Sequence, residues 1–175
     1  MTWAICLVVL TGTFTGCDDL FDGSGLSLNS NYSNMELSVP QSPAGEYIFI
    51  EELLPTNIDD AINETNSDYS SINSIILIEA TAEILNNENE ELNYDAFSSV
   101  KVAISTDGLP EKVIAKITEI PDEADELVMD LQNTDVTEYL DAEKYFVTAY
   151  AVLDKDIETP MNILVKLRYK ITLGF

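Results

Sequence analysis

Carboxylates are the side chains through which this sequence has the most chemistry to offer. Its 175 residues include 32 Asp and Glu, 8 Lys and Arg and no His, and the formal net charge is −24. Without His, the Ser-His-Asp and Cys-His arrangements of nucleophilic catalysis and the commonest zinc ligand are excluded. What remains is oxygen-ligated metal binding, paired-carboxylate catalysis, or reactions of Lys, Tyr and Ser.

Two acidic clusters are candidates for such chemistry. The first is Asp122-Glu123-Ala124-Asp125-Glu126, and the second is Asp154-Lys155-Asp156-Ile157-Glu158. Calcium prefers six to eight oxygen ligands, but the first cluster lacks the alternating spacing of an EF-hand loop, so we predict a solvated turn. The second cluster lies between two predicted strands and is typical of a hairpin loop. Since no carboxylate pair can be assigned across a sugar cleft, we expect no enzyme activity, metal site or cofactor.

Tyrosines offer a second possibility, because sugar-binding β-sandwiches use exposed aromatic rings as stacking platforms. Tyr32, Tyr47, Tyr69 and Tyr94 lie in or near stretches that we predict to be irregular. In such stretches they could build a platform for a glycan. The favoured interpretation is that the rings are partly buried, with their hydroxyls hydrogen-bonded.

The distribution of charge restricts the partners. Residues 1–100 carry 17 acids and no base, whereas residues 101–175 carry 15 acids and all 8 bases. A field of this sign repels nucleic acid, whose backbone is bound through Lys and Arg, and it disfavours adsorption to anionic membranes. Attachment to a membrane therefore needs a device other than charge.

Three of the bases share one predicted strand. Between residues 162 and 173 apolar and polar residues alternate, which places Lys166, Arg168 and Lys170 together on the exposed face. We expect these bases to offset acids on neighbouring strands. The alternative is a dedicated anion site.

The elements that must position these residues are mostly strands. Alternation with a period of two predicts strands at 26–39, 74–85, 127–131, 145–153 and 162–173, and a β-hairpin over 98–118. Asp107-Gly108 supplies the turn of that hairpin. Helix signals are confined to single turns, one of them opened by the capping box from Asp135 to Glu138.

This pattern predicts an all-β fold in a single domain that spans residues 26–175. About seven to nine short strands with turn signals between them are typical of an antiparallel β-sandwich, immunoglobulin-like or jelly-roll-like. Short helical turns are expected in its loops.

The first residues of the chain differ in character from the rest. An apolar run from Trp3 to Leu10 is too short for a membrane-spanning helix and matches the core of a signal peptide, so we predict that 1–16 is removed. Residues 17–25 are acidic and Gly-rich, which indicates a flexible tether. The alternative is a buried N-terminal strand that ends in an ordinary Cys.

Phe14-Thr15-Gly16-Cys17 resembles the lipobox of bacterial lipoprotein precursors. The resemblance implies that Cys17 receives a diacylglycerol and becomes the first residue of the mature chain. Asp18 and Asp19 directly after it resemble the surface-export signal of Bacteroidota lipoproteins. The order of elements over residues 70–173 is similar to that of small Bacteroidota lipoproteins with one β-sandwich domain and no known catalytic residues.

The resemblance implies a lipoprotein of the outer membrane, held through lipid on Cys17 and displayed at the cell surface. We expect a non-enzymatic module that docks a protein of the cell envelope, with no nucleic-acid partner. The alternative is a glycan-binding accessory lipoprotein of a nutrient-uptake system. Coplanar exposed Tyr rings would favour the glycan, and an apolar surface patch on the order of several hundred Å² would favour the protein.

Overall fold

The computed structural model describes residues 26–53, 58–63, 69–85, 92–140 and 145–174. The predicted signal segment 1–16 and the tether 17–25, with Cys17, Asp18 and Asp19, lie outside the described residues.

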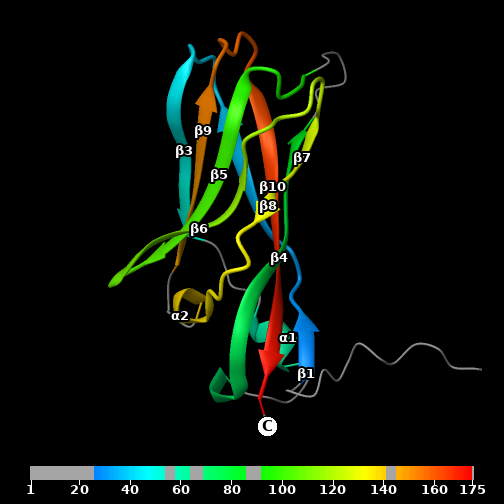
Figure 1. Ribbon diagram of the computed structural model, residues 1–175, viewed down its shortest axis with the longest axis vertical. Coiled ribbons are helices and arrows are strands. Elements are labelled where there is room, and N and C mark those ends of the chain that lie inside the picture. Colours follow the sequence, from blue (N-terminus) through cyan, green and yellow to red (C-terminus); the bar gives the residue numbers. More distant parts are fainter. Residues whose placement is uncertain (1–25, 54–57, 64–68, 86–91, 141–144, 175) are drawn as a thin grey trace, which may run out of the picture.

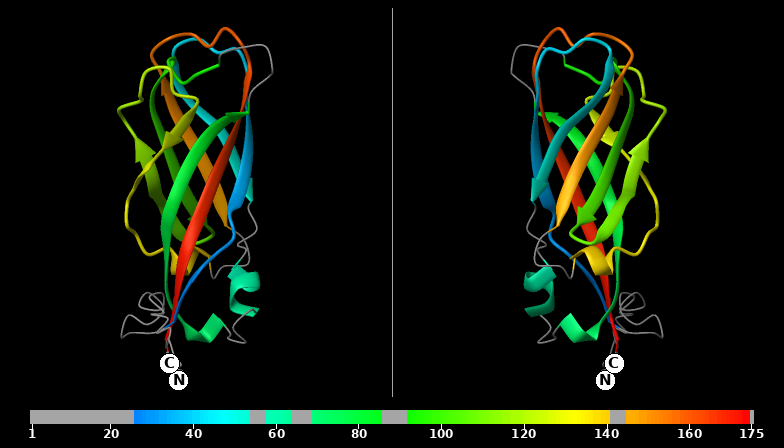
Figure 2. Two further views of the ribbon diagram at one scale, coloured as in Figure 1. Left: turned by 90° about the vertical axis from the view of Figure 1, so that its right-hand side faces the viewer. Right: turned by 90° about the vertical axis from the view of Figure 1, so that its left-hand side faces the viewer.

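Two antiparallel sheets pack face to face, which confirms the predicted all-β sandwich (Figures 1 and 2). The sheet here called the β10 sheet contains β1 (Leu26–Asn29), β2 (Ser33–Val39), β10 (Met161–Leu173), β4 (Ile72–Leu85) and β7 (Glu126–Val128). The sheet here called the β9 sheet runs in the order β3 (Gly45–Leu53), β9 (Phe146–Leu153), β5 (Phe97–Thr106), β6 (Leu109–Ile117) and β8 (Asp130–Leu131). The helical pieces are short: α1 (Ile58–Asn63), the 3-10 turn η1 (Tyr69–Ser71) and α2 (Thr137–Leu140).

β10 illustrates why these residues form a sandwich. Its odd-numbered residues from Met161 to Leu173 are buried, while the even-numbered ones alternate with them at the opposite face. Ile163, Val165 and Leu167 thus face the core together with the inner residues of β9 and β5. Each fully buried aliphatic side chain contributes about 1.5–3 kcal/mol, so this alternation favours one register of the strand over its one-residue slip.

The described residues form ten strands, whereas about seven to nine were expected. Two of the predicted strands are divided, and β3 was not predicted. The stretch 26–39 is interrupted after β1, where the Ser30 N–H donates to the Tyr169 carbonyl at 2.8 Å. The stretch 127–131 changes sheets at Met129, whose N–H donates to the Ala80 carbonyl at 3.0 Å. β7 before it pairs with β4, and β8 after it pairs with β6.

The connection between the last two strands also differs from the prediction. Residues 154–158 do form a loop, but β9 and β10 belong to different sheets, so the loop bridges the sandwich and the predicted hairpin is wrong. The 98–118 hairpin, by contrast, is confirmed as β5 and β6. At its turn Gly108 has φ +86°, a conformation that favours glycine.

The predicted capping residue of α2 is confirmed. The Asp135 carboxylate accepts hydrogen bonds from the Thr137 N–H, at 2.9 Å, and from the Thr137 hydroxyl. Partial burial acts to raise the pKa of Asp135, but the hydrogen bonds from Thr137 and the Ile75 backbone, with the charge of Lys112, outweigh it and lower the pKa.

β4 and β10 extend beyond the rest of the sandwich, and β1 accompanies them at that end (Figure 1). Leu26, the first described residue, pairs with Leu173, so the described chain begins beside its C-terminal strand end. The loops 40–44 and 154–160 lie at the opposite end of the long axis (Figure 2). Among the described residues, no helix has the length and apolar character needed to cross a membrane.

Candidate functional site

The tyrosines that were considered for a platform lie in different parts of the molecule. Tyr32 is 38% exposed, and its hydroxyl donates to Glu79 on the β10 sheet at 2.8 Å. Tyr47 lies on the edge strand β3 and stacks on Phe49 with ring centroids 5.6 Å apart, and Tyr94 is buried in the core. The side chain of Tyr69 lies outside the described residues. Tyr32, Tyr47 and Tyr94 therefore do not share a stacking surface.

The bases of β10 behave as predicted at two positions. Lys166 forms an ion pair with Glu83 at 2.6 Å, and Arg168 forms one with Glu79 at 2.6 Å. The hydrogen bond with Glu83 raises the pKa of Lys166. Lys170 lies opposite the uncharged Asn29 and Ile76. Neutralised by cross-strand acids, Lys166 and Arg168 do not form a dedicated anion site.

The two acidic clusters lie in or beside loops at the end of the molecule remote from Leu26. Asp122, Glu123 and Asp125 are exposed, which confirms the predicted solvated turn. The Asp156 carboxylate accepts from the Ala44 N–H at 2.8 Å, and the Asp95 carboxylate accepts from the Glu123 N–H at 2.8 Å. Within the described residues, no three acidic residues gather in a way that could hold a metal ion.

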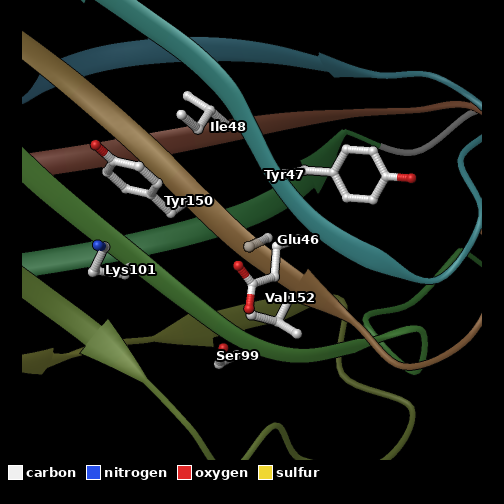
Figure 3. Close-up of a pocket in the computed structure, with 8 residues that line it drawn as sticks. Glu46, Tyr47, Ile48, Ser99, Lys101, Tyr150 and Val152 are labelled. Atoms are coloured by element: carbon white, nitrogen blue, oxygen red, sulfur yellow. The ribbon is translucent and has the colours of Figure 1, made fainter.

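The candidate site is a hollow on the outer face of the β9 sheet, over β3, β9 and β5 (Figure 3). Its volume is about 510 Å³. We call it the face hollow and define it by its lining residues, which are Glu46, Tyr47, Ile48, Ser99, Lys101, Tyr150, Ala151 and Val152.

Strand pairing places these side chains in a fixed order. Ile48 on β3 lies opposite Tyr150 on β9, which lies opposite Lys101 on β5. Lys101 in turn lies opposite Lys116 on β6, which is exposed. One row across four strands therefore runs from an apolar side chain, over an aromatic ring, to two ammonium groups. The neighbouring row contains Glu46, Val152 and Ser99.

Tyr150 forms one wall of the hollow. Its hydroxyl donates to the Glu111 carboxylate near the start of β6, so the ring must lie across β5. The Lys101 Nζ is 3.8 Å from the centroid of the same ring, a cation–π contact worth about 0.5–1 kcal/mol at an exposed site. Val152 and Ser99 are shorter than these neighbours, and the surface is hollowed beside them (Figure 3).

Ile48 supplies the exposed apolar surface at the edge of the sheet. It is 65% exposed, although its strand partner Tyr150 is half-buried. The pairing of β3 with β9 is irregular between Ile48 and Ile50. Such irregularities occur at sheet edges and redirect side chains.

The two lysines of this face lack the acidic partners that Lys166 and Arg168 have. In the part of the chain that the structure describes, the ion pairs closer than 4.0 Å are those of Lys166 and Arg168. Lys116 has Asp130 as its other cross-strand neighbour, yet the two do not form an ion pair within that distance. The face hollow therefore has exposed apolar surface and one lysine, Lys101, in its lining, with Lys116 beside it on β6; within the described residues neither ammonium group is in an ion pair closer than 4.0 Å.

This arrangement is suited to binding. Glu46 is the single carboxylate among the lining residues, whereas glycoside hydrolysis uses two carboxylates on either side of the bond to be broken. No protein-family model matches this chain, and a comparison with curated proteins finds no significant match.

The face hollow is not predicted from the sequence, because β3 is absent from the strands that the alternation predicts. Residues 46–50, Glu-Tyr-Ile-Phe-Ile, carry a signal for a strand, since aromatic and β-branched residues follow Gly45 in one run. Lys101 falls within the hairpin predicted over 98–118, but its alignment with Lys116, Tyr150 and Ile48 depends on the register between three pairs of strands.

Proposed function

We propose that this chain is a lipoprotein anchored in the outer membrane through Cys17, displayed at the cell surface, and that it docks a protein partner without catalysis. The observation that carries the docking role is the face hollow. Exposed apolar side chains set beside charged groups are typical of surfaces that bind proteins. The lining holds Ile48, Val152 and Tyr150 on one open face.

The position of Leu26 supports the proposed display. A tether of nine residues, 17–25, spans at most about 30 Å when fully extended. It would join a lipid on Cys17 to the end of the long axis where Leu26 pairs with Leu173. The loops and the upper part of the β9 sheet would then face away from the membrane, where a partner could reach them.

A glycan-binding role receives less support from the described residues. Tyr32 and Tyr94 lie apart, one beside the β10 sheet and one in the core. Tyr150, which does line the hollow, has the Lys101 ammonium against its ring. The ring face that a sugar would stack on is therefore shared with a charged group.

The anchor is tested by cell fractionation. Cys17→Ala should release the protein from the membrane fraction, because the thiol that would carry the lipid is absent. Cys6→Ala, which removes the other cysteine of the chain, is the matched control and should stay with the membranes. If the Cys17→Ala protein still sediments with membranes, the lipid anchor is wrong.

Surface display is tested separately. Asp18→Asn combined with Asp19→Asn should reduce digestion of the protein by protease added to intact cells, while membrane association is kept. Unchanged digestion would show that these two residues are not an export signal.

The docking role is tested by photo-crosslinking in intact cells. A photoreactive amino acid at position 48 should yield a crosslinked product with another protein. The same group at position 38, on the outer face of β2 in the other sheet, is the control and should not give that product. Absence of a product at position 48 would overturn docking at the face hollow.

A further inference from the structure

We propose that the face hollow binds an extended segment of a partner protein that carries an apolar residue and an acidic residue four positions later. The apolar side chain would contact Ile48 and Val152, and the carboxylate would lie over Lys101 and Lys116. This inference rests on the proposed docking function and specifies the chemistry of the partner.

The cross-strand pair of lysines carries the argument for an acidic group. Residues directly opposite each other in an antiparallel pair have their Cβ atoms about 4.5–5.5 Å apart, and like charges at such positions destabilise the sheet. Lys101 and Lys116 occupy such a pair in a chain with four times as many acids as bases. The Lys101 Nζ lies over the Tyr150 ring of β9, so a carboxylate bound between the two lysines would draw this ammonium group toward Lys116 and replace the repulsion with charge-assisted hydrogen bonds.

The spacing of the strands sets the spacing within the ligand. The row from Ile48 through Tyr150 and Lys101 to Lys116 crosses the adjacent strands β3, β9, β5 and β6. Neighbouring strands are about 4.8 Å apart, so the midpoint of the two lysines lies about 12 Å from Ile48. In an extended chain residues i and i+4 are about 13 Å apart and point to the same side.

Three carboxylates lie near the row from Ile48 to Lys116 and limit where an acidic side chain can bind. Glu46 is in the row beside Ile48, Glu111 accepts the hydroxyl of Tyr150, and Asp130 lies beyond Lys116. The space over the two lysines is therefore the favourable position for a carboxylate on this face. The apolar residue of the segment should bind at the β3 edge, because an acidic residue at that position would be repelled by Glu46.

The inference is tested with peptides and the purified chain in mild detergent. The probe is a labelled peptide containing Val-Thr-Ser-Thr-Glu. The controls are the same peptide with Gln for Glu, and one with Glu moved to the third position after Val. At physiological salt we expect the dissociation constant of the probe to be roughly tenfold lower than that of either control, because one charge-assisted hydrogen bond changes affinity by about this factor.

Variants of the chain show which lysines cause the preference for the Glu peptide over the Gln peptide. Lys101→Gln combined with Lys116→Gln should abolish the difference between Glu and Gln peptides, while Lys166→Gln on the other sheet should leave it intact. A thermal melt shows that each variant is folded. Equal binding of the Glu and Gln peptides to the unaltered chain would overturn the inference, as would complete displacement of the probe by equimolar inorganic phosphate.

Crosslinking at position 48 separates this inference from the docking role. If the crosslink to a partner survives in the Lys101→Gln, Lys116→Gln variant, docking stands and the acidic segment is wrong. Loss of the crosslink in that variant, with retention in Lys166→Gln, supports the acidic segment. A product that contains two copies of this chain would overturn the proposed partner.

Discussion

The outer faces of the two sheets use their bases in opposite ways. On the β10 sheet, Lys166 and Arg168 each meet a glutamate of β4 at 2.6 Å. On the β9 sheet, Lys101 lies opposite Lys116 beside a hollow of about 510 Å³. Basic side chains are therefore neutralised by glutamates on the β10 sheet, whereas on the β9 sheet two lysines remain able to bind an anionic group. A net charge of −24 describes neither face.

Truncation of one tyrosine on each face should give the largest difference in the free energy of unfolding. Tyr150→Ala should lower the free energy of unfolding by about 2 kcal/mol, because it removes a half-buried ring together with its contacts to Lys101 and Glu111. Tyr32→Ala on the other face should cost less, because Tyr32 lies in the link between β1 and β2 rather than in a central strand, although its ring also contacts Arg168 and its hydroxyl donates to Glu79. Chemical denaturation of both variants measures the difference. Equal losses of stability in the two variants would show that the Tyr150 ring contributes no more to the β9 sheet than the Tyr32 ring does to the β10 sheet.

Alkaline pH should lower the stability of the protein through its buried core tyrosines. Burial raises the pKa of Tyr145 to about 12, although a hydrogen bond with Ser33 acts in the opposite direction. Below a pH of about 10 the Tyr145 hydroxyl is protonated in both the folded and the unfolded state, so its contribution to stability is complete. Above that pH the unfolded state loses the proton first, and the free energy of unfolding declines. We expect unfolding at pH 11 to require about 1 kcal/mol less than at pH 9 on account of this group.

Tyr145→Phe is the variant that isolates this effect. Its loss of stability between pH 9 and pH 11 should be smaller than that of the unaltered chain, as measured by thermal melts at matched ionic strength. Burial also raises the pKa values of Tyr94 and Tyr169, so part of the loss should remain. An identical pH profile for Tyr145→Phe would contradict the assignment.

The acids of the β10 sheet should contribute smaller amounts. Glu79→Gln and Glu83→Gln should each lower the free energy of unfolding by about 0.5 kcal/mol, because partly exposed ion pairs contribute little. Asp130→Asn on the β9 sheet should have almost no effect, since Asp130 forms no ion pair with Lys116 within 4.0 Å in the described chain. Denaturation in low and high salt checks both statements, because screening should reduce only the glutamate effects.

How far the sequence predicted these two faces depends on whether a feature is local. The alternation along β10 and the turn at Asp107-Gly108 are encoded in adjacent residues, and both were predicted correctly. The exchange of sheets at Met129 follows from pairing with Ala80 of β4, nearly fifty positions away, so the predicted single strand was wrong. The face hollow belongs to this second class, because it exists only through the register of β3, β9, β5 and β6.

Reversing one charge on each face should give effects of opposite sign. Lys116→Glu turns the like-charged pair with Lys101 into an attractive one, and it also places a second acid opposite Asp130. Because Asp130 lies at the short edge strand β8 and forms no ion pair with Lys116 within 4.0 Å in the described chain, the first effect should dominate and raise the free energy of unfolding by about 0.3 kcal/mol. Lys166→Glu turns the pair with Glu83 into a repulsive one and should lower it by a similar amount. Denaturation of the two variants under identical conditions measures both signs.

A stabilising Lys116→Glu would mean that the natural residue is kept at a cost to folding, as expected where a charge serves binding. The same substitution should weaken binding of the Val-Thr-Ser-Thr-Glu peptide. If Lys116→Glu destabilises the chain as much as Lys166→Glu does, then Lys116 has a structural partner on its own sheet. The two faces would then use their bases alike, and the lysine pair could no longer be taken as evidence for an acidic ligand.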